Sequence, residues 1–335
     1  MPDGALGKFG RWGRSGWPRD TRGLPKRPGA IRSRMPFSEA RTAPPKVYGR
    51  IGDLEVRLAR TKADVKRAQR LRYDVFYREM SAKPSIKAQL RRRDEDRYDA
   101  ICDHLLVVDL APQADDALGR TWRSNRQPRV IGTYRVLRQE VADRTSGFYT
   151  QGEYDIAPLI AARSPGYRFM ELGRSCVLKP YRNKRTVELL WHGLWTYVRE
   201  HKVDVMIGCA SFEGIDPDEH AMALSFLYHH ALAPPEWRVT AHPQMHTEMN
   251  MIPKEKIDAK AALKSLPPLI KGYLRLGAKV GDGAVIDRQF GTTDVLIVLP
   301  VENIDPRYFE HFGAPEERES RVAVAKYASR KQASN

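Results

Sequence analysis

The segment FMELGRSCVLKPYRNKRTVELLWHGLWTYV, residues 169–198, decides the fold class of this chain. Its first ten residues form a mostly apolar run with the length and composition of a strand. The run breaks at Lys179-Pro180, and ELLWHGLWTYV, residues 188–198, follows with a helical pattern. The next strand is VDVMIGCAS, residues 203–211. This strand–helix–strand order predicts an α/β fold with helices on both faces of one sheet.

The same mixed pattern extends to both sides of this segment. LEVRLA, residues 54–59, alternates apolar and polar side chains like a half-buried strand. A helix is expected over residues 61–80, because Thr61 and Asp64 form a capping signature before an apolar stripe. Further strands are expected at 103–110, 129–137, 284–290 and 293–301, and helices at 217–232 and within 256–276.

Positive charge is concentrated at the N-terminus. The 335 residues include 57 Lys and Arg against 41 Asp and Glu, and residues 1–50 hold 12 of these basic residues but only 3 of the acidic ones. These residues are rich in Gly, Pro and Arg without a hydrophobic period. They are therefore predicted to form a mobile basic tail, with order beginning near Asp53. Because 41% of the chain is hydrophobic, the remainder can bury a core.

Several classes of protein are excluded by what the sequence lacks. The longest apolar run, Val295 to Val301, is far shorter than the ~20 residues that cross a bilayer, and the N-terminus has no apolar signal-peptide core. Cys102, Cys176 and Cys209 each lie in a strand-like run, which indicates reduced thiols of a cytosolic protein. No CxxC, HExxH or GxxxxGK[ST] motif occurs, so no metal site is expected.

Charged residues occupy positions where the expected fold needs apolar side chains. Arg135 lies within the apolar strand 129–137, and Glu171 and Arg174 lie within the central strand. Because burying an unpaired charge is unfavourable, these groups must pair with one another, with the acidic loop 91–99, or with a ligand. The full set is Arg72 and Phe76 on one face of the first helix, Asp96 and Asp99 in the loop, Arg135, Glu171 and Arg174. Each member alone also fits a solvated or structural role, but the set indicates a functional cleft.

In order and spacing, this set resembles the signature of the acyl-homoserine-lactone synthases, which have the acetyltransferase-like GNAT fold. That resemblance ends near residue 180. A second resemblance covers about 54–313, where RLRYDVFYREM, DHLLVVD, VIGTYRVLR, ELGRSCVLKPYRNKRTVELLWHG, LSFLYHH and LPPLIKGYLRLGAKVGDGAVID are similar to motifs of bacterial L-ornithine N-alpha-acyltransferases. That family attaches a 3-hydroxyacyl chain to ornithine and so makes the lyso precursor of ornithine lipids. The resemblance implies a GNAT-like domain over 51–313 with a C-terminal extension, followed by a polar tail at 314–335.

The resemblance also implies roles for the charged set. The implied catalytic residues are Glu171, Arg174, Asp96 and Asp99, and the implied substrate-binding residues are Arg72, Phe76 and Arg135. Glu171 is expected to accept the proton of the attacking amine, and Arg174 and Arg135 to orient that carboxylate or to bind the carboxylate of the substrate. No Ser or Cys nucleophile is needed, because an amine attacks a thioester directly.

The donor side is predicted to bind the acyl-phosphopantetheine of acyl carrier protein, with no permanently bound cofactor. In GNAT-type folds the donor arm pairs with a splayed central strand, here Met170 to Leu178, and N–H groups near Val177 would stabilise the oxyanion. Relatives that use coenzyme A carry a glycine-rich loop after this strand, whereas PYRNKRT, residues 180–186, has no glycine. Its basic residues are disfavoured by the dipole of the following helix and suit an anionic partner. The implied donor-binding residues are Val177, Lys179, Arg182, Lys184 and Arg185.

Alternative functions are an acyl-homoserine-lactone synthase or another amino-acid N-acyltransferase, and a nucleic-acid-binding protein acting through the basic tail. The first is disfavoured because about 150 residues continue past the shared part, and the last because no specific nucleic-acid motif follows the tail. The expected location is the cytoplasm, with peripheral contact between the tail and the anionic inner face of the cytoplasmic membrane.

Overall fold

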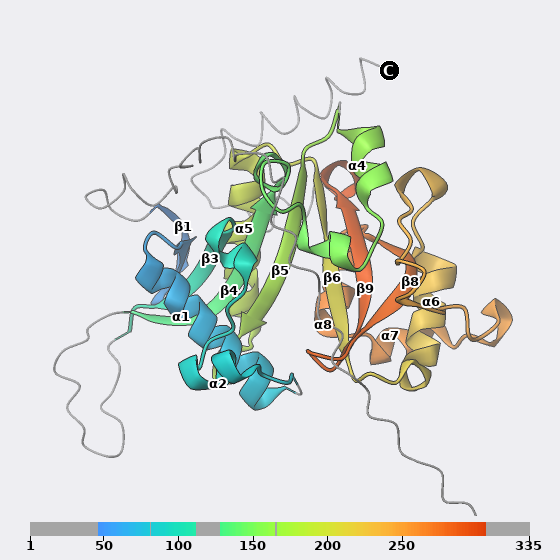
Figure 1. Ribbon diagram of the computed structural model, residues 1–335, viewed down its shortest axis with the longest axis horizontal. Helices are drawn as coiled ribbons and strands as arrows, with labels where there is room; N and C mark the ends of the chain where they lie inside the picture. Colours follow the sequence, from blue (N-terminus) through green and yellow to red (C-terminus); the bar gives the residue numbers. More distant parts are fainter. Residues whose placement is uncertain (1–45, 81, 112–127, 165, 306–335) are drawn as a thin grey trace, which may run out of the picture. The chain divides into compact units, whose positions relative to one another are not determined.

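The computed structural model describes residues 46–80, 82–111, 128–164 and 166–305. Within these ranges nine strands form one sheet (Figure 1). They are β1 (Val47–Ile51), β2 (Leu54–Leu58), β3 (Asp103–Asp109), β4 (Arg129–Arg138), β5 (Phe169–Val177), β6 (Val205–Glu213), β7 (His246–Thr247), β8 (Lys279–Asp287) and β9 (Thr292–Pro300). Every strand expected from the sequence is present.

The expected helices are present, together with three that the sequence did not predict, at 86–91, 139–142 and 157–163. They are α1 (Lys62–Tyr73), α2 (Ile86–Arg91), α3 (Gln139–Ala142), α4 (Ala157–Arg163), α5 (Lys184–Glu200), α6 (Ala221–Ala231), α7 (Ala259–Ser265) and α8 (Pro268–Arg275). Shorter helical turns are η1 (Asp74–Glu79), η2 (Arg97–Ala100), η3 (Tyr149–Gly152), η4 (Lys179–Tyr181), η5 (Pro217–His220), η6 (Pro235–Trp237), η7 (Lys254–Lys256) and η8 (Val301–Asn303). Thr61 and Asp64 form the predicted capping box, and the helix that they start continues through η1, a π-helical turn.

The strand order is β1-β2-β3-β4-β5-β6-β9-β8-β7. All neighbouring strands are antiparallel except β5 and β6, which are parallel because α5 crosses between them. Their pairing covers only Phe169 to Glu171 on β5 and Val205 to Ile207 on β6. Beyond these residues the two strands separate, as Figure 1 shows. The splayed strand expected from the resemblance is therefore present.

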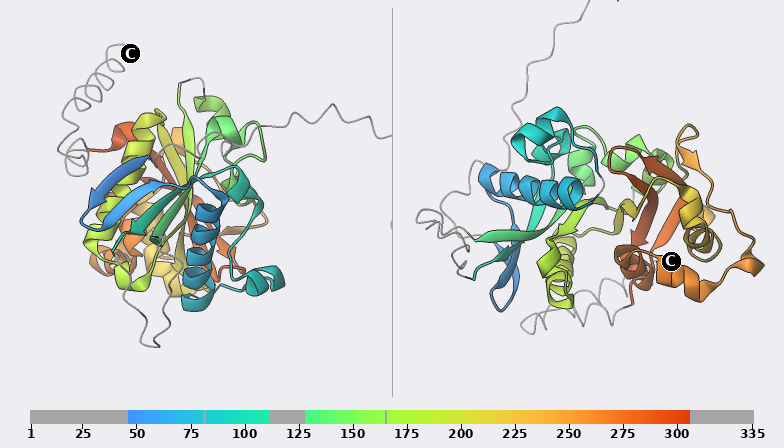
Figure 2. Two further views of the ribbon diagram at one scale, coloured as in Figure 1. Left: turned by 90° about the vertical axis from the view of Figure 1, so that its left-hand side faces the viewer. Right: turned by 90° about the horizontal axis from the view of Figure 1, so that it is seen from below.

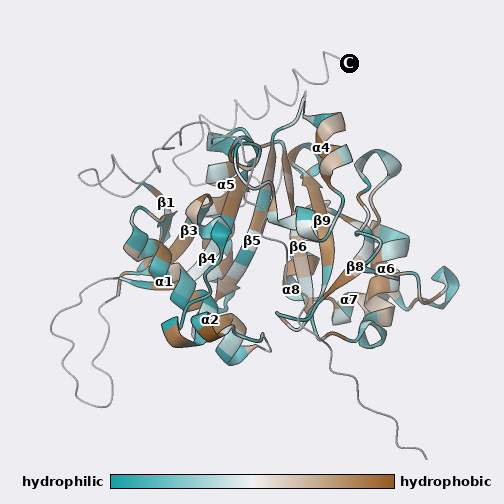
Figure 3. Ribbon diagram, viewed as in Figure 1, coloured by the Kyte–Doolittle hydropathy of each residue, from teal (hydrophilic) through white to brown (hydrophobic). Residues whose placement is uncertain are grey.

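Both faces of the sheet are covered by helices (Figure 2). Leu105 of β3 packs in one cluster with α5, whereas its neighbour Leu106 packs in another with α1. Since successive side chains of a strand point to opposite faces, α5 and α1 lie on opposite sides of the sheet. A third cluster joins α4 to β9 and to η3. The strands at the centre are correspondingly apolar, β9 most clearly (Figure 3).

The first strand begins before the position where order was expected to start. Residues 47–50, assigned from the sequence to the basic tail, belong to β1, so the expectation that order begins near Asp53 is wrong. Tyr48 is buried, its hydroxyl donates to Glu200 at 2.8 Å, and its carbonyl oxygen lies 2.8 Å from Nε2 of His192. These contacts come from α5, distant in the sequence, so the short run VYGRI does not reveal its strand. Residues 1–45 and 314–335 lie outside the described residues.

β8 also begins earlier than expected, at Lys279 instead of residue 284. The added stretch KVGDG contains two glycines and a register shift, which conceal the strand pattern. No helix in the described ranges combines the length and the apolar character that crossing a membrane requires.

Candidate active site

A cavity of about 550 Å³ lies where β5 and β6 separate. Its walls come from both strands and from η1, η3, α8 and the β8–β9 hairpin. Six of the residues singled out in the sequence line it: Phe76, Arg135, Glu171, Arg174, Val177 and Arg182. Arg72, Asp96, Asp99, Lys179, Lys184 and Arg185 are not among the lining residues. Half of the residues predicted from the sequence therefore line this cavity, and the other half do not.

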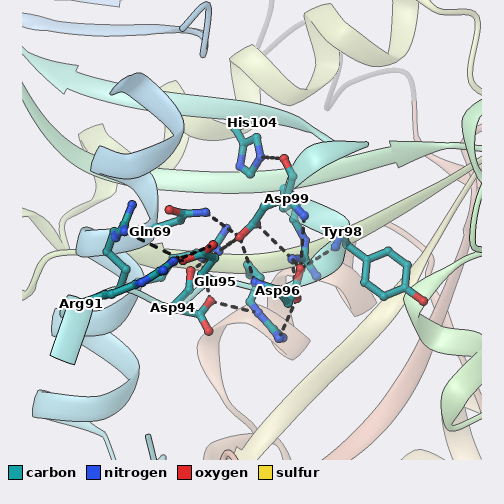
Figure 4. A network of polar contacts seen from close by, with 12 residues as sticks. Gln69, Arg91, Asp94, Glu95, Asp96, Tyr98, Asp99 and His104 are labelled. Carbon is teal, nitrogen blue, oxygen red and sulfur yellow. Dashed lines mark hydrogen bonds and ion pairs between the residues drawn. The ribbon is translucent and has the colours of Figure 1, made fainter. Parts of the chain in front are cut away.

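A buried network of ion pairs borders the cavity, around the loop that contains Asp94, Asp96 and Asp99 (Figure 4). Arg72 of α1 is fully buried and donates from Nη2 to both carboxylate oxygens of Asp99, at 2.9 and 2.8 Å. Its Nε lies 2.8 Å from Asp94 Oδ2. Burial alone would raise the pKa of Asp99, but Arg72 and Arg135 lower it to about 2. Arg72 therefore connects α1 to the loop through two ion pairs.

The two other arginines connect the same loop to the sheet. Arg135 of β4 donates from Nη1 to both oxygens of Asp96, each at 2.7 Å, and to Asp99 at 3.2 Å. Arg174 of β5 donates to Asp96 at 3.3 Å, and its Nε lies 3.3 Å from Asp94. The arginines were expected to orient Glu171 or to bind the substrate; in the structure their ion pairs are with aspartates of the loop. Three arginines and three aspartates balance in charge.

The backbone of β5 is distorted at Arg174. Its φ of +52° lies in the left-handed region, and the register between β4 and β5 shifts between Thr133 and Arg135. This is the geometry of a β-bulge, in which one strand carries an extra residue and its side chain is redirected. The guanidinium of Arg174 lies 5.0 Å from the ring centre of Tyr149 and 4.5 Å from that of Phe290. The bulge thus directs a cation to the cavity wall.

Glu171 is held by backbone groups. Its Oε2 accepts from the N–H of Tyr149 at 2.8 Å, and its Oε1 from the N–H of Thr150 at 2.6 Å. The residue is 5% exposed, and burial raises the pKa of the carboxyl, although these N–H donors and Arg135 oppose the shift. A carboxylate oriented in this way, with a raised pKa, is equipped to accept a proton inside the cavity.

Of the other carboxylates that line the same cavity, three form a cluster that was not identified from the sequence: Glu153, Asp287 and Asp294. One oxygen of each lies within 4.8 Å of the others. Asp294 is a charged residue within the apolar strand predicted at 293–301. Arg135 and Glu171 were singled out for the same reason, so Asp294 could have been identified from the sequence. Glu153 follows an irregular stretch and carries no such signal.

The donor-side residues differ in position. Val177 and Arg182 line the cavity, and Arg182 donates to the carbonyl of Val177 at 2.9 Å and pairs with Glu79. Lys184 and Arg185 are exposed at the first turn of α5, and Lys184 lies 3.5 Å from Glu188. Lys179 is also exposed. These three basic residues are therefore close in sequence to Val177 and Arg182 but do not line the cavity.

Apolar side chains complete the cavity on the side of η1. Phe76 and Phe290 pack edge to face with ring centres 5.8 Å apart, and Met80 and Leu269 also line the wall. The cavity thus combines an apolar wall with a polar one, an arrangement suited to an apolar chain that ends in a reactive polar group.

Comparison with known proteins agrees with this architecture. Residues 71–192 match the family model described as the acetyltransferase (GNAT) domain, which confirms the expected fold. Three relatives are each named L-ornithine N(alpha)-acyltransferase. That of Agrobacterium fabrum is 52% identical over 81% of this chain and 89% of its own length. The Rhizobium meliloti protein is 54% identical over 80% and 87%, and the Brucella abortus protein 51% identical over 81% and 93%.

Proposed function

This chain belongs to the L-ornithine N(alpha)-acyltransferase family, and on that premise we propose that it transfers a 3-hydroxyacyl chain from acyl carrier protein to the α-amino group of L-ornithine. The product would be a lyso-ornithine lipid. The observation that carries the proposal is the cavity between β5 and β6, where an oriented carboxylate faces an apolar wall. In this proposal the cavity receives the thioester end of the donor together with the amino acid.

The proposed reaction is a direct aminolysis. The neutral amine attacks the thioester carbon, a C–N bond forms, the C–S bond breaks, and the phosphopantetheine thiol leaves. The α-ammonium carries three protons and the amide nitrogen keeps one, so two protons must leave. One passes to solvent before the attack. Glu171 accepts the other as the C–N bond forms, directly or through a water molecule, and returns it to the departing sulfur. Atoms and charges balance without a metal or a redox partner.

The oxyanion of this reaction needs N–H donors on the open edge of β5. Leu178 donates its amide to Ile131 of β4 at 2.9 Å. Because successive residues of a strand direct their amides to opposite sides, the N–H of Val177 points away from β4. The bond from Arg182 to the carbonyl of Val177 agrees with this direction. Val177 is thus our candidate for oxyanion stabilisation.

The choice of acyl carrier protein over coenzyme A rests on the start of α5. Two basic residues, Lys184 and Arg185, occupy its first turn, and no acidic residue accompanies them there. The helix dipole disfavours cations at this end, whereas an anionic partner would neutralise them. Together with Arg182 and Lys179 they suit one phosphate and the acidic surface of a carrier protein.

The proposal is tested by incubating the purified protein with L-ornithine and a 3-hydroxyacyl thioester of either acyl carrier protein or coenzyme A. We expect an N-acylated ornithine, detected by mass spectrometry, with the carrier protein as the preferred donor. A preference for the coenzyme A thioester would refute the donor assignment. A preference for glycine or lysine would refute the acceptor assignment.

A further inference from the structure

An acidic cluster of Glu153, Asp287 and Asp294 occupies the wall of the active-site cavity. Glu153 follows η3, Asp287 ends β8, and Asp294 lies within β9. One oxygen from each carboxylate lies within 4.8 Å of the other two. The residue after η3 and the β8–β9 hairpin, which are distant from each other in the sequence, thus bring three carboxyl groups to one point, although like charges repel.

No cation of the described residues neutralises this cluster directly. Arg174, the arginine that influences Glu153 and Asp294, makes its ion pairs with Asp94 and Asp96. Asp294 is 6% exposed, and its Oδ1 has no hydrogen-bond partner within the described ranges. A buried carboxylate oxygen without a partner is unfavourable unless a ligand completes it.

The pKa values of two carboxyls in the cluster are also raised. Burial raises the pKa of Glu153 to about 7, and Asp294 adds to the effect. Burial likewise raises the pKa of Asp294 to about 6, although the hydroxyls of Ser211 and Thr292 oppose it. Both carboxyls therefore retain protons unusually well, because they are buried and lie close to other carboxylates.

Building on the proposed function, we infer that Glu153, Asp287 and Asp294 bind the side-chain ammonium of the acceptor and so select a diamino acid. An ammonium group has three N–H donors, and the cluster offers one oxygen from each of three carboxylates. A divalent cation such as Mg²⁺ or Ca²⁺ would need about six or more oxygen ligands. The ammonium therefore matches the cluster without further ligands.

The position of the cluster relative to Glu171 suits a short diamino acid. Ile207 of β6 pairs with Glu171, and Cys209, two residues further along β6, donates its thiol to Glu153 at 3.1 Å. Two residues of a strand span about 7 Å, comparable with the extended length between the two amino groups of a short diamino acid. The α-amine can then lie at Glu171 while the distal ammonium reaches the cluster.

The test compares L-ornithine with L-norvaline, which has the same carbon chain without the distal amine. We expect Asp294→Asn and Glu153→Gln to lower kcat/KM for ornithine about tenfold or more, the scale of a lost charged hydrogen bond, and to leave norvaline unchanged. Asp53→Asn, the same change at an exposed turn, serves as the control. Melting temperatures verify folding, which should persist because each change removes a buried unpaired charge.

Calorimetry gives a readout independent of turnover. Ornithine binding should expel protons from the cluster, so the measured heat should depend on the ionisation enthalpy of the buffer, and this dependence should shrink in Glu153→Gln. An unchanged ornithine-to-norvaline ratio in both variants would overturn the inference, as would activity lost in EDTA and restored by Mg²⁺ or Mn²⁺. If the wild type acylates no amino acid, the proposed function fails, and ornithine binding by calorimetry still decides the inference.

Discussion

At the scale of single residues, the cavity contains buried carboxylates in two different environments. Glu171 receives two backbone N–H donors, whereas Glu153 receives one thiol and lies next to two other carboxylates. Burial raises the pKa of both. The difference in hydrogen bonding separates their roles: Glu171 is oriented for proton transfer, and Glu153 is available to a cation.

Glu171→Gln is expected to lower turnover about 100-fold or more, the usual scale for losing a general base. The amide replaces one acceptor oxygen by a donor that faces a backbone N–H, so unfolding should also become easier by ~1–3 kcal/mol. Steady-state kinetics and urea denaturation measure the two effects. Leu159→Ala, in α4 and outside the cavity, is the control for destabilisation and should keep normal turnover. Normal turnover in folded Glu171→Gln would remove Glu171 from the mechanism.

Stability should depend on pH through Glu153. Its pKa is raised from 4.5 to about 7 in the fold, where Asp287, Asp294, Cys209 and Arg174 face it. The folded state therefore holds the proton more tightly, so this contribution to stability is complete below pH 4.5 and is lost as the pH rises through 7. The free energy of unfolding should fall by at most ~3 kcal/mol through this titration, and Glu153→Gln should remove that fall.

Urea denaturation at pH 5 and pH 8 measures this difference. The free energy of unfolding of Glu153→Gln, relative to wild type, should be clearly greater at pH 8 than at pH 5. Equal differences at the two pH values would mean that Glu153 titrates normally in the folded protein.

At the scale of elements, β5 combines two irregularities that create the site. Its pairing with β6 stops after Glu171, and its pairing with β4 contains the bulge at Arg174. The first irregularity opens the cavity, and the second directs the guanidinium of Arg174 to the cavity wall. Both are backbone features, so the site depends on strand geometry as much as on the side chains.

Arg174→Ala is expected to destabilise the protein by ~3–5 kcal/mol, because it leaves Asp94 and Asp96 with an uncompensated charge, and activity should fall with stability. Arg174→Gly removes the same charge but tolerates the left-handed φ. The glycine variant should therefore be more stable than the alanine variant by ~1 kcal/mol, measured by chemical denaturation. An alanine variant as stable as the glycine variant would show that the bulge carries no backbone strain.

At the level of the whole molecule, the proposed acylation and the proposed membrane contact involve different residues. Residues 1–45 contain 10 Lys and Arg against 3 Asp and Glu and lie outside the described residues. The residues that line the cavity lie between Val75 and Asp294. The product of the proposed reaction is an amphiphile, so contact with an anionic membrane through the basic segment would aid its release.

Deletion of residues 1–45, which leaves β1 intact, should abolish flotation with vesicles containing anionic lipid. Each basic residue contributes about 1 kcal/mol near such a surface, and high salt should have the same effect as the deletion. Acylation of ornithine in solution should persist, and vesicles of zwitterionic lipid provide the control. Unchanged flotation of the shortened protein would place membrane contact on the folded domain, and a salt-sensitive gel shift with DNA would favour the nucleic-acid alternative.

Local sequence patterns were enough to predict the fold class, the strands and the longer helices, and they singled out several residues that line the cavity around Glu171. These features depend on local periodicity, capping and residue motifs, such as Thr61 with Asp64 at the start of α1. The family resemblance stated from the motifs is confirmed by relatives at 51–54% identity. β1 was missed because contacts from the distant α5 hold it in place, and the start of β8 because two glycines and a register shift conceal its strand pattern.

Only the tertiary structure decided which charges meet. The arginines at 72, 135 and 174 pair with aspartates of the loop and not with Glu171, and Asp94 is part of that network. Glu153, Asp287 and Asp294 converge because η3, β8 and β9 meet at the opening between β5 and β6. The physical reason is that proximity across a sheet follows from strand order, register and a single bulge, which are long-range properties that residue spacing does not encode.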